Sequence, residues 1–261
     1  FPYVWSPTSV PGFAFNSRAY FGRDAAPEAD ALIERTERTS DAGDGSLTID
    51  PRTVPAAGPR RYVVEAVVSG DDGREVTATR EILGLPGVAL GVKMPTVVKH
   101  IGVLTPQFVA VGADGEFLGD HPVTMRLYRR DWHTQLRATD FSSGIGKYVT
   151  EPVDTLLSEQ ALRSVAGPKA APIRVEEAGV YILEFASKDA LGRRYTARAD
   201  FFVAGERAVS WSKPPAKVLK VSVDKSRYEP GDTAQMMVQS PYRDAHVLMV
   251  AEAPDGVRYR W

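Results

Sequence analysis

The stretch Tyr181-Ile182-Leu183-Glu184 decides the fold, because it recurs in the chain as Tyr62-Val63-Val64-Glu65. Each copy is followed at the same spacing by a Gly-Arg and then a Thr-Ala pair: Gly73-Arg74, Thr77-Ala78, Gly192-Arg193 and Thr196-Ala197. All of these pairs are 119 residues apart, with no insertion between them. That period is too long for a solenoid repeat but matches one sandwich domain, so it predicts tandem copies of one fold.

Apolar and polar residues alternate along the second copy, as in strands with one buried face. Tyr195, Ala197 and Phe201 fall on one face of 195–203, and Thr196, Arg198 and Asp200 fall on the other. The 181–185 and 123–127 stretches alternate similarly, and the 22 Gly and 19 Pro residues suit a turn-rich chain. Turns are expected at four places: Asp72-Gly73, Asp114-Gly115, Tyr228–Asp232 and Asp255-Gly256. The fold class is therefore predicted as all-β, built from tandem antiparallel β-sandwich domains.

Two segments could form helices, namely Ala25–Arg38 and Leu156–Ser164. Leu156, Leu157, Ala161 and Leu162 would make one helical face. The same stretch fits a strand with a bulge, and the pattern leaves both interpretations open.

The repeat also predicts the domain boundaries. We expect a domain at 1–85 that lacks its first strands, a complete domain at 86–205, a linker at 206–217 and the start of a third domain at 218–261. The linker carries Pro214-Pro215, which favours extended chain. Since Phe1-Pro2-Tyr3 does not resemble a translation start or a signal peptide, we expect residue 1 to be an interior position of a longer protein.

Charge and composition narrow the function classes. A net charge of −1 gives no global field to hold nucleic acid, so we expect no such partner. The chain has no Cys, which excludes disulfides, thiolate nucleophiles and Cys-ligated metals in this sequence. No apolar run reaches the ~18 residues of a membrane span, so we expect no membrane insertion by this segment.

The chemistry-bearing residue types form no recognisable constellation. His100, His121, His133 and His246 lack partners at metal-ligand spacing, and Gly144–Lys147 lacks the earlier glycine of a phosphate loop. Asp41–Gly45 and Asp71-Asp72 are typical of turns, although calcium binding is the alternative. Trp132, Trp211 and Trp261 suit core or interface positions better than sugar platforms. We therefore expect no catalytic, cofactor-binding or metal-binding residue, no cofactor and no enzymatic activity.

One combination of segments is far more specific than a generic sandwich. It comprises Val221–Ala234 with its Asp-Lys-x-x-Tyr-x-Pro-Gly-Asp core, Ser240-Pro241-Tyr242, the apolar 247–250 run before Glu252, Gly179-Val180-Tyr181 with Asp189–Arg193, and Tyr128–Trp132. Together these segments resemble the bacterial α2-macroglobulin family of large periplasmic protease-trapping proteins. The family's thioester motif contains Cys and is absent from this sequence, and no bait segment is recognisable.

The resemblance implies macroglobulin-type, immunoglobulin- or fibronectin-like domains in the scaffold of an endopeptidase inhibitor that serves bacterial defence. It implies that the full-length protein binds proteases and that neighbouring macroglobulin domains contact this segment. It also implies a periplasmic or cell-envelope location, with a lipid anchor on the full-length protein as one option. The alternative is a generic adhesion or carbohydrate-binding array of immunoglobulin-like modules on an exported protein.

Overall fold

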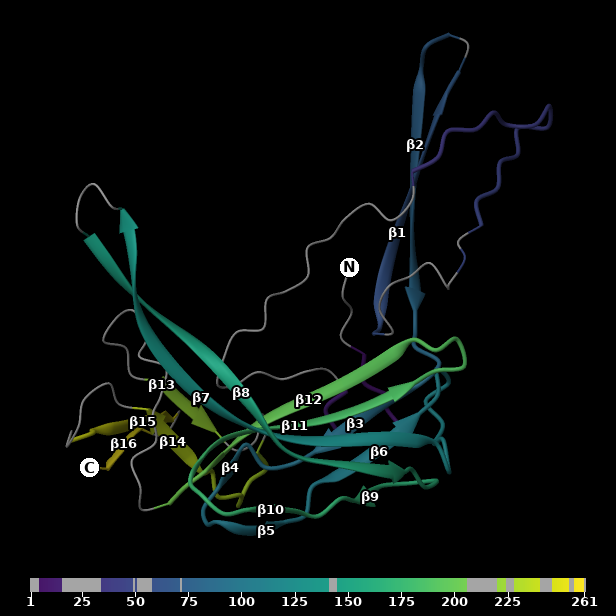
Figure 1. Ribbon diagram of the computed structural model, residues 1–261. Helices are drawn as coiled ribbons and strands as arrows, with labels where there is room; N and C mark the ends of the chain where they lie inside the picture. The colour runs from purple at the N-terminus through teal and green to yellow at the C-terminus, as the bar shows by residue number, and fades with distance from the viewer. Residues whose placement is uncertain are drawn as a thin grey trace. The chain divides into compact units, whose positions relative to one another are not determined.

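A computed structural model describes much of the chain, and every regular element in the described part is a β-strand (Figure 1). The described residues are 5–15, 34–48, 50, 58–70, 72–140, 145–205, 220–223, 228–239, 246–253 and 256–260. They form two compact units, Phe1–Arg130 with Asp154–Arg207 and Asp131–Val153 with Ala208–Trp261. The all-β prediction is confirmed.

Two sheets in the first unit form the sandwich. One has the order β4-β12-β11-β7-β8, comprising Val97–Val98, Arg194–Val203, Gly179–Lys188, Pro122–Asp140 and Ile145–Arg163. The other has the order β3-β6-β9, comprising Ala89–Lys93, Gln107–Val111 and Lys169–Ala170. A two-stranded sheet pairs β5 (Gly102–Leu104) with β10 (Ile173–Val175). The pairs β11–β12, β11–β7, β3–β6 and β6–β9 are antiparallel, whereas β12 and β4 are parallel.

The core lies between these layers and is made by the face that alternation selected. Tyr181, Leu183 and Phe185 of β11 are at most 2% exposed, as are Ala197 and Phe201 of β12. Within the sheet, Tyr181 stacks on Phe201 at 5.5 Å between ring centroids. Across the layers, the Phe185 ring stacks on Phe108 of β6 at 5.0 Å.

The repeat is present in the structure as two hairpins of identical register. Strand β1 (Arg60–Ser69) pairs with β2 (Glu75–Gly84) so that Tyr62 faces Ile82, and β11 pairs with β12 so that Tyr181 faces Phe201. Both turns place their glycine in the left-handed region, with φ of 75° at Gly73 and 76° at Gly192. The backbone hydrogen bonds of the two turns also correspond, which confirms that the two segments are equivalent.

The two hairpins differ in what covers them. Val76 and Ile82 lie on the face that corresponds to the core of the second copy, yet they are 70% and 52% exposed. Arg80 faces Val64 at the place that Ala199 occupies opposite Leu183. The repeat predicts a core on this face of the first copy too, but among the described residues no second sheet packs on β1 and β2, and that core is not formed.

An N-terminal segment contributes to the sandwich core, which the sequence did not indicate. Val10, Phe13 and Phe15 are at most 7% exposed and belong to the same hydrophobic cluster as β3 and β6. Ala14 exchanges two backbone hydrogen bonds with Val92 of β3, at 2.8 and 3.0 Å. The buried hydroxyl of Tyr195 donates to the carbonyl oxygen of Phe15.

The C-terminal part contains two short hairpins. Strand β13 (Lys220–Val223) pairs with β14 (Met236–Gln239), and β15 (Met249–Ala253) pairs with β16 (Gly256–Arg260). Asp232 donates its backbone N–H to the carbonyl of Glu229 at 3.0 Å, and Gly231 has a φ of 96°, which confirms the predicted turn at Pro230-Gly231. The Asp255 turn and the predicted linker lie outside the described residues.

The helix interpretation of Leu156–Ser164 is wrong, because 156–163 form the end of strand β8. Its apolar residues Leu156 and Leu157 are about half exposed rather than lining one buried face. Of the other helix candidate, residues 34–38 are irregular and the remainder lies outside the described part.

Candidate functional site

The outer face of the five-stranded sheet carries a network of ion pairs. Arg130 of β7 binds Asp154 of β8 through two parallel hydrogen bonds of 2.7 and 2.9 Å. The Arg130 side chain is only 6% exposed, so its charge is buried, and the Asp154 carboxylate compensates it through this bidentate pair. Arg198 of β12 approaches the same carboxylate at 3.4 Å.

Glu184 of β11 connects a second set of arginines. Its carboxylate accepts from Arg126 at 3.2 Å and from Arg194 at 3.0 Å, and Arg198 lies 3.5 Å away. Arg126 also donates to Glu159 of β8 at 2.5 Å, and these hydrogen bonds raise the pKa of the Arg126 guanidinium. The network therefore joins β8, β7, β11 and β12 across their outer face.

The alternation of apolar and polar residues predicts that this outer face lies in water, but part of the face is buried. Asp200 is 5% exposed and Val180 is fully buried on the same face. Arg198 is ion-paired, and its guanidinium carbon lies 5.9 Å from the centre of the Tyr128 ring. Long arginine side chains lie over neighbouring strands, so a charged residue type on this face does not imply an exposed position.

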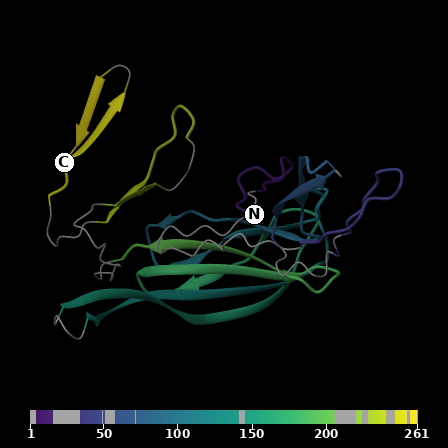
Figure 2. The same ribbon diagram turned by 90° about the horizontal axis from the view of Figure 1, so that it is seen from above.

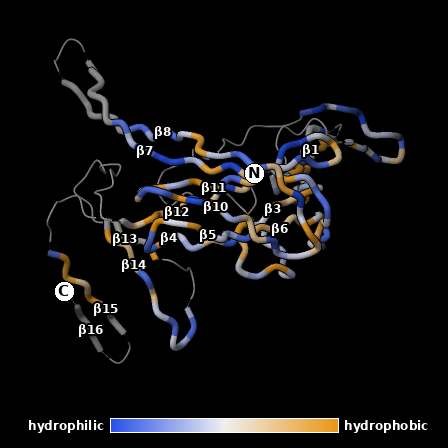
Figure 3. The backbone as a smooth tube through the Cα atoms, turned by 60° about the horizontal axis from the view of Figure 1, so that its bottom comes forward, coloured by the Kyte–Doolittle hydropathy of each residue, from blue (hydrophilic) through white to orange (hydrophobic). Residues whose placement is uncertain are grey.

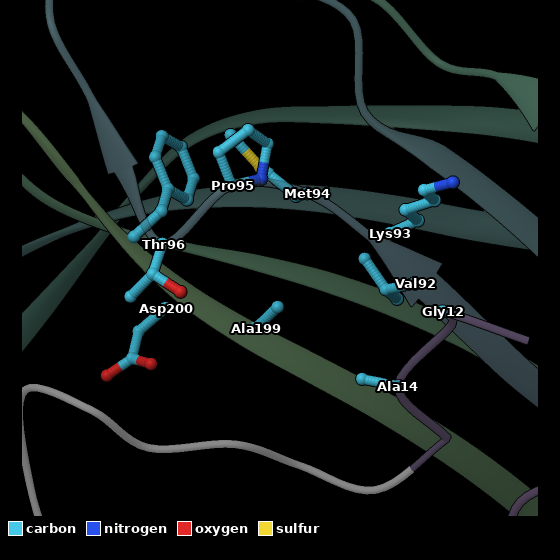
Figure 4. A pocket seen from close by; sticks show the side chains of 10 residues that line it. Gly12, Ala14, Val92, Lys93, Met94, Pro95, Thr96, Ala199 and Asp200 are labelled. Carbon is cyan, nitrogen blue, oxygen red and sulfur yellow. The ribbon is translucent and has the colours of Figure 1, made fainter. Parts of the chain in front are cut away.

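A small cavity lies on the other side of β12 (Figure 4). It has a volume of about 70 Å³, and its walls include the short apolar side chains of Ala14, Val92 and Ala199. Asp200 and Lys93 also line it. Binding sites for organic ligands are typically several hundred Å³, so this cavity has room for a few water molecules only.

The side chain of His121 contacts that of Ser187, and this contact is not a catalytic pair. Its Nε2 lies 2.8 Å from Oγ of Ser187, while that hydroxyl donates to the carbonyl of Pro122 at 2.7 Å. Because the hydroxyl proton is used, the imidazole must be the donor and cannot act as a base toward Ser187. His133 is exposed in β7, and His100 and His246 are exposed in loops that are far apart in the sequence.

The remaining sequence candidates are found in turns and strands. Asp41–Gly43 is a turn, and Gly144 lies outside the described residues while Ile145–Lys147 begin β8. Asp72 accepts the backbone N–H of Arg74 at 3.1 Å, and Asp71 is not described. Trp132 is half-buried in β7, and Trp211 and Trp261 are not described. Within the described part of the chain, no three His, Asp or Glu side chains are grouped so that they could hold a metal ion.

Two aspartates are tied to arginines at sandwich turns. At Asp189, burial opposes ionisation, but hydrogen bonds from Arg193 and from the backbone of Leu191 outweigh it and lower the pKa. At Asp120, the hydrogen bonds from Arg163 lower the pKa of the carboxyl. Both pairs fix turn geometry, which assigns them a structural role.

Comparison with known proteins gives consistent results. The chain is 21% identical over 231 residues to an alpha-2-macroglobulin homolog of Nostoc, and 26% identical over 196 residues to the alpha-2-macroglobulin of Rickettsia conorii. The chain is related to the bacterial alpha-2-macroglobulins. The native structure of Escherichia coli alpha-2-macroglobulin shares the fold over 99% of this chain and 17% of its own, with a TM-score of 0.51 and 18% identity. No profile of a known protein family matches the chain.

The relation to alpha-2-macroglobulins covers nearly the whole chain but a small part of each relative. The aligned regions span 88% and 73% of this chain, and 12% and 10% of the Nostoc and Rickettsia proteins. The described residues contain no helix long and apolar enough to cross a membrane. Sequence reasoning missed the ion network, although its visible signal was the spacing of two arginines, four residues apart, in each of two strands: Arg126 and Arg130 in β7, and Arg194 and Arg198 in β12.

Proposed function

We propose that this chain is a scaffold segment of an alpha-2-macroglobulin-like endopeptidase inhibitor, which traps attacking proteases after they cleave it. The observation that carries the proposal is the sequence relation to named alpha-2-macroglobulins over 88% of the chain. The shared fold with the E. coli protein supports it. The adhesion-array alternative has no comparable support.

The geometry suits a framework better than a reaction centre. The sandwich core is closed by stacked aromatic rings, and the outer face of its larger sheet is held by the ion pairs around Glu184. Such a unit resists deformation because close-packed interiors yield little to strain. In the proposed function it frames or transmits the change that protease cleavage starts elsewhere in the protein.

Partners and location follow from the same proposal. We propose that endopeptidases bind through the complete polypeptide and that neighbouring macroglobulin domains pack against this segment. We further propose a periplasmic or cell-envelope location, with a lipid anchor on the full-length protein. No enzymatic step is assigned to this chain.

Co-elution on a sizing column tests the proposal. The complete natural polypeptide that carries this sequence is mixed with an active endopeptidase, and in parallel with the same endopeptidase inactivated at its catalytic serine. We expect the active enzyme to elute with the large protein and the inactivated one to elute alone, because trapping requires cleavage. Equal elution of the two enzymes, or no co-elution of either, would overturn the proposal.

A further inference from the structure

Three Asp-Gly dipeptides lie in the described part of the chain, and in two of them the glycine is the left-handed residue of a tight turn. They are Asp44-Gly45, Asp72-Gly73 and Asp114-Gly115, and Asp255 of a fourth pair lies outside the described residues. Among dipeptides that begin with aspartate, Asp-Gly rearranges most readily without an enzyme, because the glycine nitrogen is unhindered and lies close to the side-chain carboxyl carbon. Whether a given pair reacts depends on what its N–H group and its carboxylate already bind.

In Asp72-Gly73 both reacting groups are occupied. The N–H of Gly73, a residue with a φ of 75°, donates to the carbonyl of Gly70 at 2.9 Å. The Asp72 carboxylate accepts the backbone N–H of Arg74 at 3.1 Å. The nitrogen that would have to lose its proton is therefore a hydrogen-bond donor, and the carboxylate is held by the N–H of the residue beyond it.

Asp114-Gly115 has the same arrangement. The N–H of Gly115 donates to the carbonyl of Gly112 at 3.0 Å, and Gly115 has a φ of 83°. The Asp114 carboxylate accepts the backbone N–H of Glu116, also at 3.0 Å. Because Asp72-Gly73 and Asp114-Gly115 share this geometry, we call them the turn pairs.

Asp44 closes a turn of the same kind, and Gly45 follows it. The N–H of Ser40 donates to the carbonyl of Asp44 at 2.9 Å, and the N–H of Gly43 donates to the carbonyl of Ser40 at 2.8 Å. Gly43, with a φ of 82°, therefore takes the place that Gly73 has in its own turn. The N–H of Asp44 donates to the hydroxyl of Ser40 at 3.1 Å, so the turn is complete without any group of Gly45.

Both reacting groups of Asp44-Gly45 are open. Within the described part of the chain, neither the Gly45 N–H nor the Asp44 carboxylate has a hydrogen-bond partner. Both residues are exposed, and a side chain added at Gly45 would meet no atom within 4 Å. Residues 34–48 contain no helix or strand, and Figure 2 draws them, in dark violet-blue, as an open loop that folds back on itself. Figure 3 colours most of this loop hydrophilic or neutral.

We propose that Asp44-Gly45 is a site of spontaneous covalent modification, at which the aspartate converts to isoaspartate while the turn pairs stay unmodified in the folded chain. The Asp44 side chain and the Gly45 nitrogen supply both reacting groups, and water is the only other reactant. This inference rests on hydrogen bonding and exposure, and it is independent of the proposed function.

The conversion takes two balanced steps. In the first, the Gly45 nitrogen attacks the carboxyl carbon of the Asp44 side chain, a new C–N bond forms, and the carboxyl hydroxyl leaves with the N–H proton as water. The product is a succinimide ring. In the second step, water opens the ring: breaking the new C–N bond restores aspartate, and breaking the original peptide C–N bond gives isoaspartate. No atom is oxidised or reduced, and the final mass equals that of the starting chain.

Isoaspartate changes the loop without changing its composition. The backbone gains one carbon atom between residues 44 and 45, and the former Asp44 carbonyl, which accepts the Ser40 N–H, becomes an anionic carboxylate. The two forms therefore differ in backbone path and in the position of a charge, although their mass and net charge are the same. Detection must rely on chemistry rather than on mass alone.

Ageing of the folded chain in heavy-oxygen water tests the proposal. The chain is held at neutral pH and body temperature for several weeks, and proteolytic peptides are analysed by mass spectrometry at intervals. Each ring opening adds one heavy oxygen atom to the peptide that reacted. A protein-isoaspartate methyltransferase, with S-adenosylmethionine as the methyl donor, then labels the free α-carboxylate of isoaspartate.

We expect both signals to accumulate at the Asp44 peptide at least about tenfold faster than at either turn pair, because a turn pair must first break the hydrogen bonds that hold its reacting groups. Equal rates at the three sites in the folded chain would overturn the proposal. So would a folded chain in which the Asp44 peptide gains neither heavy oxygen nor methyl groups.

Two controls separate structure from sequence. In guanidinium chloride the preference for Asp44 should fall below about threefold, because the turns that protect the other two pairs are unfolded; an undiminished preference there would show that the local sequence, and not the fold, selects the site. In the folded variant Asp44→Glu, whose longer side chain closes the corresponding ring far more slowly, both signals should vanish from this peptide and stay unchanged at the turn pairs. Methylation of Asp44→Glu equal to that of the parent would contradict the assignment.

Discussion

Truncating Phe201 to Ala should destabilise the sandwich far more than truncating Ile82, its counterpart in the repeat. Both residues occupy the same register position, opposite Tyr181 and Tyr62 respectively. Phe201 is 1% exposed and stacks on Tyr181, whereas Ile82 is 52% exposed. A buried Phe→Ala change costs roughly 3–5 kcal/mol through lost burial and cavity formation, to which the lost ring stack contributes about 0.5–1.5 kcal/mol. An exposed change costs about 0.5 kcal/mol or less.

Urea unfolding followed by far-ultraviolet circular dichroism and by tryptophan fluorescence measures both costs. We expect Phe201→Ala to lower the transition midpoint with an unchanged slope, so that the difference reflects stability rather than the denatured state. Ile82→Ala should leave the sandwich transition in place, because the β1–β2 face makes no core among the described residues. Equal losses for the two variants would refute the assignment of the buried face.

Three further changes have defined outcomes. Arg198→Gln should lower the free energy of unfolding by about 1 kcal/mol in urea titrations, because it removes two partly buried ion pairs. The control Arg174→Gln, which removes an exposed ion pair, should cost under roughly 0.5 kcal/mol. Equal costs would contradict the network. Tyr195→Phe should cost about 1–3 kcal/mol, because the carbonyl of Phe15 loses its buried donor, and a cost near zero would show that the N-terminal segment is not docked. The pKa of the Asp189 carboxyl is lower in the folded protein than its unfolded value near 3.9, so the ionised carboxylate stabilises the fold above that pH. This contribution is lost as the pH falls from about 4 through the lower folded pKa. Thermal melts of Asp189→Asn should therefore show less acid sensitivity than those of the parent, and identical profiles would exclude the contribution.

The repeat could be predicted from sequence down to the register of its hairpins. Identical offsets of the Tyr, Gly-Arg and Thr-Ala positions require the same strand pairing in both copies, and alternation within β12 identifies Phe201 as a core residue. Both features are local, since they depend on turn chemistry and on the period of a strand. The comparisons also bear out the resemblance that the 221–234 motif carries.

What could not be predicted depends on distant parts of the chain. The apolar positions of 156–163 fit a helix equally well, and pairing with β7 makes the segment a strand. Arg198 resembles a surface residue in its own strand, and only the neighbouring strands supply Asp154 and Glu184. Phe15 joins the core through a contact with Tyr195 across 180 residues of sequence, for which no local pattern exists.

The most direct test of the central claim compares how a captured endopeptidase treats small and large substrates. The complete polypeptide carrying this chain is incubated with the protease, and cleavage of a short chromogenic peptide and of a folded protein substrate is measured in the same mixture. Our account predicts that peptide cleavage persists while cleavage of the protein falls sharply, because a trap blocks access without occupying the active site. Loss of both activities in parallel, or retention of both, would contradict it.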